Sequence, residues 1–168
     1  MFILPDITSL ILDDHDWFRR AFATLDEAKT PQALSQTWDV LSMRLDLHAE
    51  AEEEIFYPQL LKSNTKPEEE TKDAISDHNK IRDAVAESKK CEIGSDQWWN
   101  FVGQARLENS KHMAEEERGP LADFRSHTNE DLRNKIGQAW IEYYSQHSEG
   151  RNLDPIDKDP EAYIEDNK

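Results

Sequence analysis

Apolar residues recur every three or four positions along most of the chain, which is the spacing of helices that bury one face. In the first segment, Ile11, Phe18, Phe22 and Leu25 keep this spacing, and His15 takes one position of the same stripe. Turn-forming residues divide the pattern into five predicted helices. The first two run over about residues 6–28 and 31–62, and the fifth runs over 128–147. The third begins at 67 and ends before the turn that Gly94 closes. The fourth begins at 95 and ends at the Gly119–Pro120 pair, with room for an extra turn to Phe124.

The predicted helices carry recognisable start and bend signals. Thr30 followed by Pro31 suits an N-cap with proline at the first helical position. Within the second helix, Pro58 predicts a bend. Thr128, with Asp131 three residues later, resembles a capping box and predicts the start of the fifth helix.

The connections between the long helices are short, so neighbouring helices are expected to be antiparallel. We therefore predict an all-α fold, namely an up-down-up-down four-helix bundle with an additional fifth helix. Residues 1–147 are expected to form one domain, with the four-helix core at 6–124 and the fifth helix at 128–147. Residues 148–168 contain two prolines and many acids, and they predict a flexible acidic tail.

Composition supports a helical domain and excludes several partners. The chain has 168 residues, enough for one ordinary domain, and only three valines among 33% charged residues, which disfavours a β-rich core. Its net charge of −16 repels phosphate backbones and anionic lipid, so we expect neither nucleic acid nor a membrane as partner. The apolar start at 1–4 stops at Pro5 without a preceding basic residue, so no secretory signal is expected. With Cys91 as the single cysteine, disulfides and thiolate clusters are excluded, and a cytoplasmic location is expected.

Six polar side chains fall on the apolar stripes, where a packed core is expected. Two pairs, His48 with Glu52 and His112 with Glu116, are spaced by four residues and therefore share a helix face. Counted from the turns, all six lie at similar heights along the bundle, within about one helical turn. The six residues are His15, His48, Glu52, His78, His112 and Glu116.

These residue types at the centre of a bundle predict a metal site. An unpaired buried carboxylate is unstable, and no Lys or Arg takes a stripe position at that height. Four imidazoles and two carboxylates suit a pair of first-row transition metals, whereas magnesium and calcium prefer oxygen ligands alone. The other acids of the clusters 52–54 and 115–117 are expected to form a solvated face. His127, in a turn, and His147, near a helix end, are also expected to be solvated.

A structural role for these residues accounts for less of the pattern. A lone histidine on an apolar stripe is commonly a hydrogen-bonded core residue, and a single His-x-x-x-Glu pair is common in an acid-rich chain. A purely structural bundle, however, leaves two buried carboxylates unexplained. A ferritin-like di-iron site is disfavoured because its Glu-x-x-His pairs are absent.

The segments that carry these residues resemble the hemerythrin-like, or HHE cation-binding, family. They are DDHDW around His15, LHAEAEEEIFYP around His48 and Glu52, SDHNKIR around His78, and KHMAEEE around His112 and Glu116, and they span about residues 8–124. The resemblance implies a four-helix bundle that holds two iron ions, bridged by carboxylates and an oxo or hydroxo group, and that reacts with dioxygen or its reduced products. It also implies that the same six residues are the iron ligands.

The chain departs from the oxygen-carrying members of this family in two respects. Those members have a fifth histidine four residues from the third-helix ligand, whereas here these positions hold Arg82 and Ala74. Their last carboxylate follows its histidine by five residues; here Glu116 and Glu117 are both available, and the stripe favours Glu116. One iron is therefore expected to be a ligand short, with solvent or a tyrosine in that position. The candidates are Tyr143 and Tyr144 on the fifth helix and, as a weaker one, Tyr57; the alternative for each is a tyrosine that packs on the bundle surface.

Two functions from different classes follow from these expectations. In the first, the protein is an iron-dependent redox enzyme. The extra open or oxygen-ligated position then favours catalase-like breakdown of hydrogen peroxide over reversible dioxygen binding. In the second, the protein binds or senses dioxygen, iron or nitric oxide without turning anything over.

Overall fold

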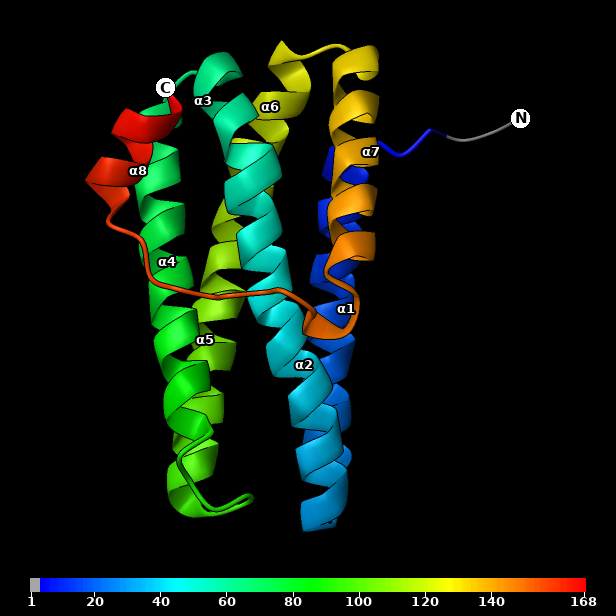
Figure 1. Cartoon of the computed structure of the whole chain (residues 1–168), viewed down its shortest axis with the longest axis vertical. Coiled ribbons are helices and arrows are strands. Elements are labelled where there is room, and N and C mark those ends of the chain that lie inside the picture. Colours follow the sequence, from blue (N-terminus) through cyan, green and yellow to red (C-terminus); the bar gives the residue numbers. More distant parts are fainter. Residues whose placement is uncertain (1–3) are drawn as a thin grey trace.

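Helices are the only regular elements among the residues that the structure, a computed structural model, describes, namely 4–168. Four long helical segments lie side by side (Figure 1). The predicted all-α fold is confirmed. The helices are α1 (Ile7–Glu27), α2 (Pro31–Ala51), the π-helical turn η1 (Glu52–Phe56), α3 (Tyr57–Ser63), α4 (Pro67–Ser88), α5 (Asp96–Arg118), α6 (Pro120–His127), α7 (Glu130–Gln146), the 3-10 turn η2 (Ser148–Gly150) and α8 (Pro160–Asn167).

Side chains cap several of these helices at their first residues. The Thr30 hydroxyl accepts a hydrogen bond from the Ala33 amide at 3.1 Å, so the predicted cap of α2 is confirmed. Helix α7 begins one residue later than the capping-box pattern predicted. Asn129 caps it instead of Thr128, because the Thr128 hydroxyl donates to the Phe124 carbonyl of α6.

The predicted bend at Pro58 takes the form of a wider helical turn. Pro58 has no amide hydrogen, and in an α-helix its ring would press on the carbonyl of Glu54. The chain avoids this contact through η1, where the Tyr57 amide bonds to the Glu52 carbonyl five residues earlier. This π-helical turn rotates the helix after it relative to the helix before it. As a result, both Glu52 and Glu53 are buried.

The buried core consists of two apolar clusters with polar side chains between them. One cluster includes Phe56, Phe124 and Trp140, and the other includes Trp38 and Trp98. Along α1, α2 and α4, the predicted site histidine lies between the last residue of one cluster and the first residue of the other. Polar groups enclosed in this way must be hydrogen-bonded or bound to a cation. We call this level of the bundle the polar layer.

Helix α7 packs on α1 and α2 at one side of the bundle (Figure 1). Gly137 permits this close packing, since a Cβ atom there would lie 1.7 Å from the carbonyl oxygen of Pro5. The same helix brings the Trp140 ring to 5.5 Å from the ring of His48, measured between centroids. Helix α7 therefore covers one half of the polar layer.

The C-terminal residues form a helix instead of the flexible tail that their composition predicts. After α7 the chain crosses α2 and ends as α8, which packs on α4 (Figure 1). Asp159 caps α8 by accepting a hydrogen bond from the Ala162 amide at 2.8 Å, and Tyr163 and Ile164 are buried. The prediction is wrong for these residues because the two apolar side chains join the core cluster beside α4, a contact that local sequence does not reveal.

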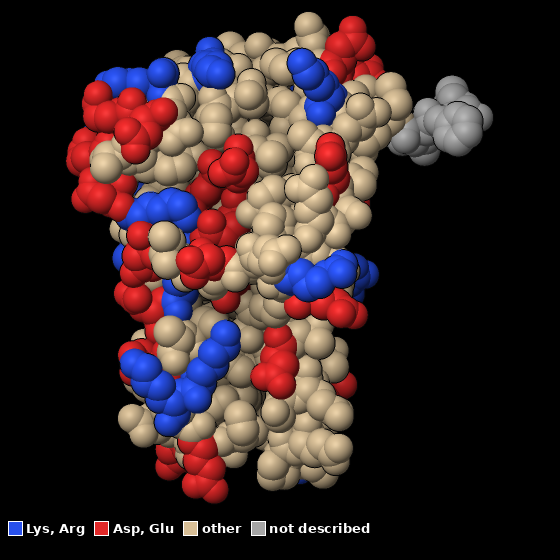
Figure 2. All heavy atoms as spheres, in the orientation of Figure 1, with Lys and Arg blue, Asp and Glu red and all other residues tan. Residues whose placement is uncertain are grey.

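The surface reflects the acidic composition. On the face shown in Figure 2, acidic side chains gather around α8 and across the middle of the molecule, with Lys and Arg side chains between them. No helix within 4–168 combines the length and the apolar character needed to cross a bilayer. Residues 1–3, on which the expectation about a secretory signal depends, lie outside the described part of the chain.

Candidate metal centre

The six predicted ligand side chains meet in the polar layer, and each is at most 3% exposed. His15 comes from α1, His48 from α2, Glu52 from η1, His78 from α4, and His112 and Glu116 from α5. Their ligand atoms form two groups, in each of which the atoms lie within 4.8 Å of one another. The first group is His15, His48, Glu52 and Glu116, and the second group is Glu52, His78 and His112. Glu52 belongs to both groups, while His127 and His147 belong to neither.

Glu52 stands between the two groups and offers one oxygen to each. Its Oε1 lies 3.0 Å from His48 Nε2, and its Oε2 lies 3.0 Å from His78 Nε2. The same Oε2 lies 3.6 Å from His112 Nε2. A carboxylate shared in this way is suited to bridge two cations.

Several of these ligand atoms are buried without a hydrogen bond. They are His15 Nε2, His48 Nε2, Glu52 Oε1 and both carboxylate oxygens of Glu116. Glu116 Oε2 lies 3.3 Å from His15 Nε2 and 3.5 Å from His112 Nε2, so it faces both groups. Buried polar atoms are normally paired because an unpaired one is unfavourable. The unpaired nitrogen and oxygen atoms fit a bound transition-metal ion, which would satisfy them all.

Each site histidine turns its second ring nitrogen, Nδ1, to a carboxylate on a neighbouring helical segment. The four pairs are His15 with Glu117 at 2.9 Å, His48 with Asp14 at 2.9 Å, His78 with Glu53 at 2.8 Å, and His112 with Asp77 at 3.8 Å. In the first three pairs the carboxylate can accept a hydrogen bond from Nδ1–H, which leaves the Nε2 lone pair free to face the centre, as metal-binding histidines require. The fourth pair, His112 with Asp77, is a longer contact between the two side chains. These partners were not predicted from the sequence, although each one is adjacent in sequence to a candidate ligand on a different helix.

Each of these carboxylates also contacts a cation. The contacts are Arg19 with Glu117, Arg44 with Asp14 and Arg82 with Glu53, each at 2.7 Å, and Lys80 with Asp77 at 3.1 Å. Arg82, at one of the two positions considered for a fifth histidine, is buried. Its guanidinium is directed to Glu53 and not to the ligand atoms, so it does not neutralise the carboxylates of the centre.

Burial and these partners act on pKa values in opposite directions. Burial would raise the pKa of Asp14, but hydrogen bonds from His48, Tyr144 and Arg44 help to lower it to about 2. Burial would also raise the pKa of Glu53, but His78 and Arg82 help to lower it to about 2. Both carboxylates are therefore ionised near neutral pH and remain acceptors for the histidine Nδ1–H groups.

Glu53 is buried, contrary to the expectation that the other acids of the cluster 52–54 are solvated. It is 3% exposed, whereas Glu54 is exposed. A regular α-helix would turn one of these acids inward, but η1 presents Glu52 and Glu53 together. Tyr57, five residues after Glu52, also falls on this face, and its hydroxyl donates to Glu52 Oε2 at 2.9 Å.

Among the three candidate tyrosines, Tyr57 reaches the ligand atoms. Its hydroxyl lies 3.4 Å from His78 Nε2, and its ring stacks on that histidine. The Tyr144 hydroxyl instead donates to Asp14 at 2.5 Å. Tyr143 packs against the histidine that follows α7. The tyrosine that sequence analysis ranked as the weaker candidate is therefore the one beside the second group.

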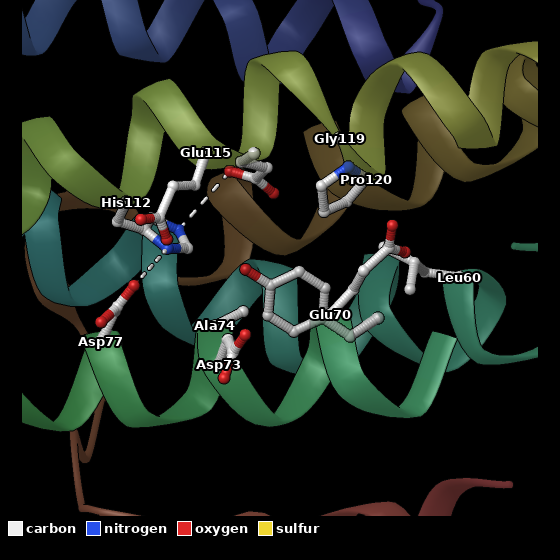
Figure 3. A pocket seen from close by; sticks show the side chains of 11 residues that line it. Leu60, Glu70, Asp73, Ala74, Asp77, His112, Glu115, Gly119 and Pro120 are labelled. Atoms are coloured by element: carbon white, nitrogen blue, oxygen red, sulfur yellow. Dashed lines mark ion pairs between the residues drawn. The ribbon is translucent and has the colours of Figure 1, made fainter. Parts of the chain in front are cut away.

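A pocket of about 210 Å³ reaches the second group between α4 and α5 (Figure 3). Its buried lining includes Tyr57, His112 and Glu116, and its exposed lining includes acids such as Asp73. Figure 3 shows the His112 ring directed toward Asp77 beside this pocket. A molecule of the size of dioxygen or hydrogen peroxide can therefore approach the second group from this side.

Comparison with known proteins adds one match. The family model described as the hemerythrin HHE cation binding domain matches residues 6–119. This range covers the four long helical segments and all six candidate ligands. No curated protein and no solved structure matches the chain.

Proposed function

Since the chain belongs to the hemerythrin HHE cation-binding domain family, we propose that its polar layer holds two iron ions at the centre of an up-down-up-down four-helix bundle. His15, His48 and Glu116 would hold the first ion, His78 and His112 would hold the second, and Glu52 would bind both. One observation carries this proposal above all. The buried ligand atoms divide into two groups that share Glu52.

The donor set supports iron over other common cations. Imidazole and carboxylate together suit iron, whereas magnesium and calcium prefer oxygen donors alone. The single cysteine, Cys91, is outside both groups, so no thiolate is present to favour copper(I) or an iron–sulfur cluster. Zinc accepts the same donors but has no redox chemistry, and metal analysis separates it from iron directly.

We infer that Tyr57 is a further ligand of the second ion. The second group has three ligand residues and the first has four. The Tyr57 hydroxyl lies 2.9 Å from Glu52 Oε2 and 3.4 Å from His78 Nε2, which places it at the edge of the smaller group. A small shift of this hydroxyl toward the cation would give both ions the same number of protein ligands.

The proposed reaction is the disproportionation of hydrogen peroxide, in which two molecules of peroxide give two of water and one of dioxygen. The two bound iron ions would supply the redox capacity for this reaction. The chain supplies the access and the shape of the site. The pocket beside His112 and Glu116 admits a small molecule, and the two apolar clusters keep bulk water out of the polar layer. The carboxylate partners hold the histidine rings and their Nδ1 protons in place.

The alternative is a protein that binds or senses dioxygen, iron or nitric oxide without turnover. The position of the pocket favours this alternative in one respect. The pocket lining includes the histidine His112 of the second group, whereas the first group contributes only its carboxylate Glu116 and neither of its histidines. A binding protein needs one accessible ion of this kind.

Metal analysis, an optical spectrum and an oxygen electrode test the proposal together. We expect two irons per chain and peroxide-dependent release of about one dioxygen per two peroxides consumed. His112→Ala should lose iron and release, whereas His127→Ala, which changes a half-exposed histidine outside both groups, should keep both. Reversible dioxygen binding without peroxide-dependent release would favour the alternative. One zinc and no iron would overturn both functions.

A further inference from the structure

The C-terminal segment, residues 151–168, contacts Glu53, the carboxylate partner of His78, through the side chains of Lys158 and Tyr163. The segment crosses α2 and ends as α8 against α4 (Figure 1). Acidic side chains are numerous around it (Figure 2). Lys158, which lies just before α8, directs its side chain inward to the acids of α2 and η1, and this side chain is 26% exposed.

Asn79 fixes the backbone of this lysine. The Asn79 side chain donates from Nδ2 to the Lys158 carbonyl at 2.8 Å, and its Oδ1 accepts from the Lys158 amide at 3.0 Å. This two-point contact resembles the pairing of neighbouring strands, in which one residue both donates and accepts. Because Asn79 directly follows His78, the contact sets the position of the C-terminal segment relative to a candidate ligand.

The ammonium group of Lys158 holds one side of the carboxylate that supports His78. Lys158 Nζ contacts Glu53 Oε2 and lies 3.0 Å from each carboxylate oxygen of Glu50. The other oxygen, Glu53 Oε1, accepts from Arg82 at 2.7 Å and lies 2.8 Å from His78 Nδ1. With Oε2 held by the lysine, Oε1 stays turned to the histidine. The Tyr163 hydroxyl of α8 donates to the Glu53 carbonyl and holds the backbone there as well.

The other three histidine–carboxylate pairs do not use this segment. Their carboxylates contact cations on α1, α2 and α4, namely Arg19, Arg44 and Lys80. Glu53 has Glu50 beside it, and both acids contact Arg82 Nη2 at 2.7 Å. One arginine cannot balance two carboxylates, and Lys158 supplies the second positive charge. Among these four pairs, Glu53 is the carboxylate whose charge is balanced in part by a residue outside the long helices, Lys158.

We propose that Lys158 is a positioning residue for His78. The C-terminal segment then helps to orient a ligand of the second group. The inference rests on the proposed function, because it assumes that His78 binds a metal ion. It follows that metal at the second group and docking of residues 151–168 stabilise each other, since such coupling is reciprocal. Replacing a residue that orients a ligand typically lowers metal affinity about 10- to 100-fold.

The test compares three full-length variants with the wild type. Lys158→Met removes the charge, and Lys158→Arg keeps it. Lys168→Met makes the same change at an exposed lysine whose partners, Glu165 on α8 and Glu68 on α4, do not contact the polar layer. We expect Lys158→Met to keep about one iron per chain under dialysis conditions in which the other proteins keep two. Its ferric absorption spectrum should also change, which a purely structural role of the lysine would not produce.

Hydrogen exchange supplies a readout that does not depend on activity. In the wild type, metal should slow amide exchange in residues 151–168, and in Lys158→Met this difference should disappear. Equal iron affinity, spectrum and metal-dependent exchange in Lys158→Met and wild type would overturn the inference while the proposed function stands. Equal losses in Lys158→Arg and Lys158→Met, with a lowered melting temperature, would also overturn it. A wild type that binds no metal would overturn both.

Discussion

The two halves of the bundle build the polar layer from the same local pattern. In each half, a histidine on the first helix is followed by a His-x-x-x-Glu-Glu segment on the second. His15 precedes residues 48–53 in one half, and His78 precedes residues 112–117 in the other. In both halves an aspartate stands before the first histidine and an arginine stands four residues after it. The halves therefore start with equivalent ligands and equivalent carboxylate partners.

The halves differ in how firmly the second histidine is held. His48 Nδ1 lies 2.9 Å from Asp14, which also contacts Arg44 at 2.7 Å. His112 Nδ1 lies 3.8 Å from Asp77, and the residue four positions before this histidine is a glutamate instead of an arginine. In the first half, His48 is therefore held by a carboxylate that an arginine balances. In the second half, His112 has a longer contact with its carboxylate.

The halves also differ in what covers them. Helix α7 packs over the first half with Trp140 against His48, whereas the second half faces the pocket and Tyr57. The same local sequence therefore occupies two environments, one closed and one accessible. We infer that a small ligand reacts or binds on the side of His78 and His112, and that His15 and His48 mainly hold a metal ion.

Glu52→Ala should have the largest effect because it removes the ligand that belongs to both ligand groups. We expect iron content to fall from about two per chain to near zero, as measured by elemental analysis of the folded protein. Glu54→Ala removes an exposed carboxylate two residues away and should leave the iron content unchanged. An intact pair of irons in Glu52→Ala would mean that the halves are independent.

Metal removal should loosen both halves. Metal ions bind the folded protein, so they raise its stability by mass action, by about 4 kcal/mol when free metal is at about 1,000 times its dissociation constant. Chelation should therefore lower the melting temperature seen by circular dichroism. Glu52→Ala serves as the control, since a chelator should not shift its melting temperature further. A wild type that melts equally with and without chelator would contradict the proposal.

Gly137→Ala should weaken the cover of the first half alone. Its Cβ would lie 1.7 Å from the Pro5 carbonyl oxygen, so α7 has to move away from α1. We expect a loss of about 1–3 kcal/mol in the free energy of unfolding, measured in urea. Gly103→Ala, where nothing lies within 4 Å of the added Cβ, should instead stabilise the exposed face of α5 by about 0.5–1 kcal/mol. Similar effects of both substitutions would show that α7 is not tightly docked.

Phenylalanine substitutions at two tyrosines give the smallest effects and distinguish the halves most sharply. Tyr57→Phe removes the hydroxyl beside the second group and should change the ferric absorption spectrum. Tyr144→Phe removes the hydrogen bond to Asp14, which should lower stability by about 1 kcal/mol and leave the spectrum unchanged. A spectrum altered by Tyr144→Phe and not by Tyr57→Phe would reverse the assignment of the tyrosine ligand.

The helices and the six side chains that meet in the polar layer were predictable from the sequence. Helix spacing is a local property, so residues such as His48 and Glu52 are assigned to one face by counting alone. The prediction that Glu53 is solvated was wrong because it also depended on counting residues along a regular helix. Counting assumes regular turns, and η1 adds a residue to one turn in response to Pro58.

The all-α class, the positions of the long helices and the residue types on their apolar faces follow from the sequence alone, because helical period and residue type are local properties of the chain. Which carboxylate contacts which histidine follows only from helix packing, since each pair joins two helical segments. The tertiary structure also determines that α7 closes one half and that Lys158 reaches Glu53 from the far end of the chain. These contacts link residues distant in sequence, and their energies depend on burial and direction that exist only after the helices have packed.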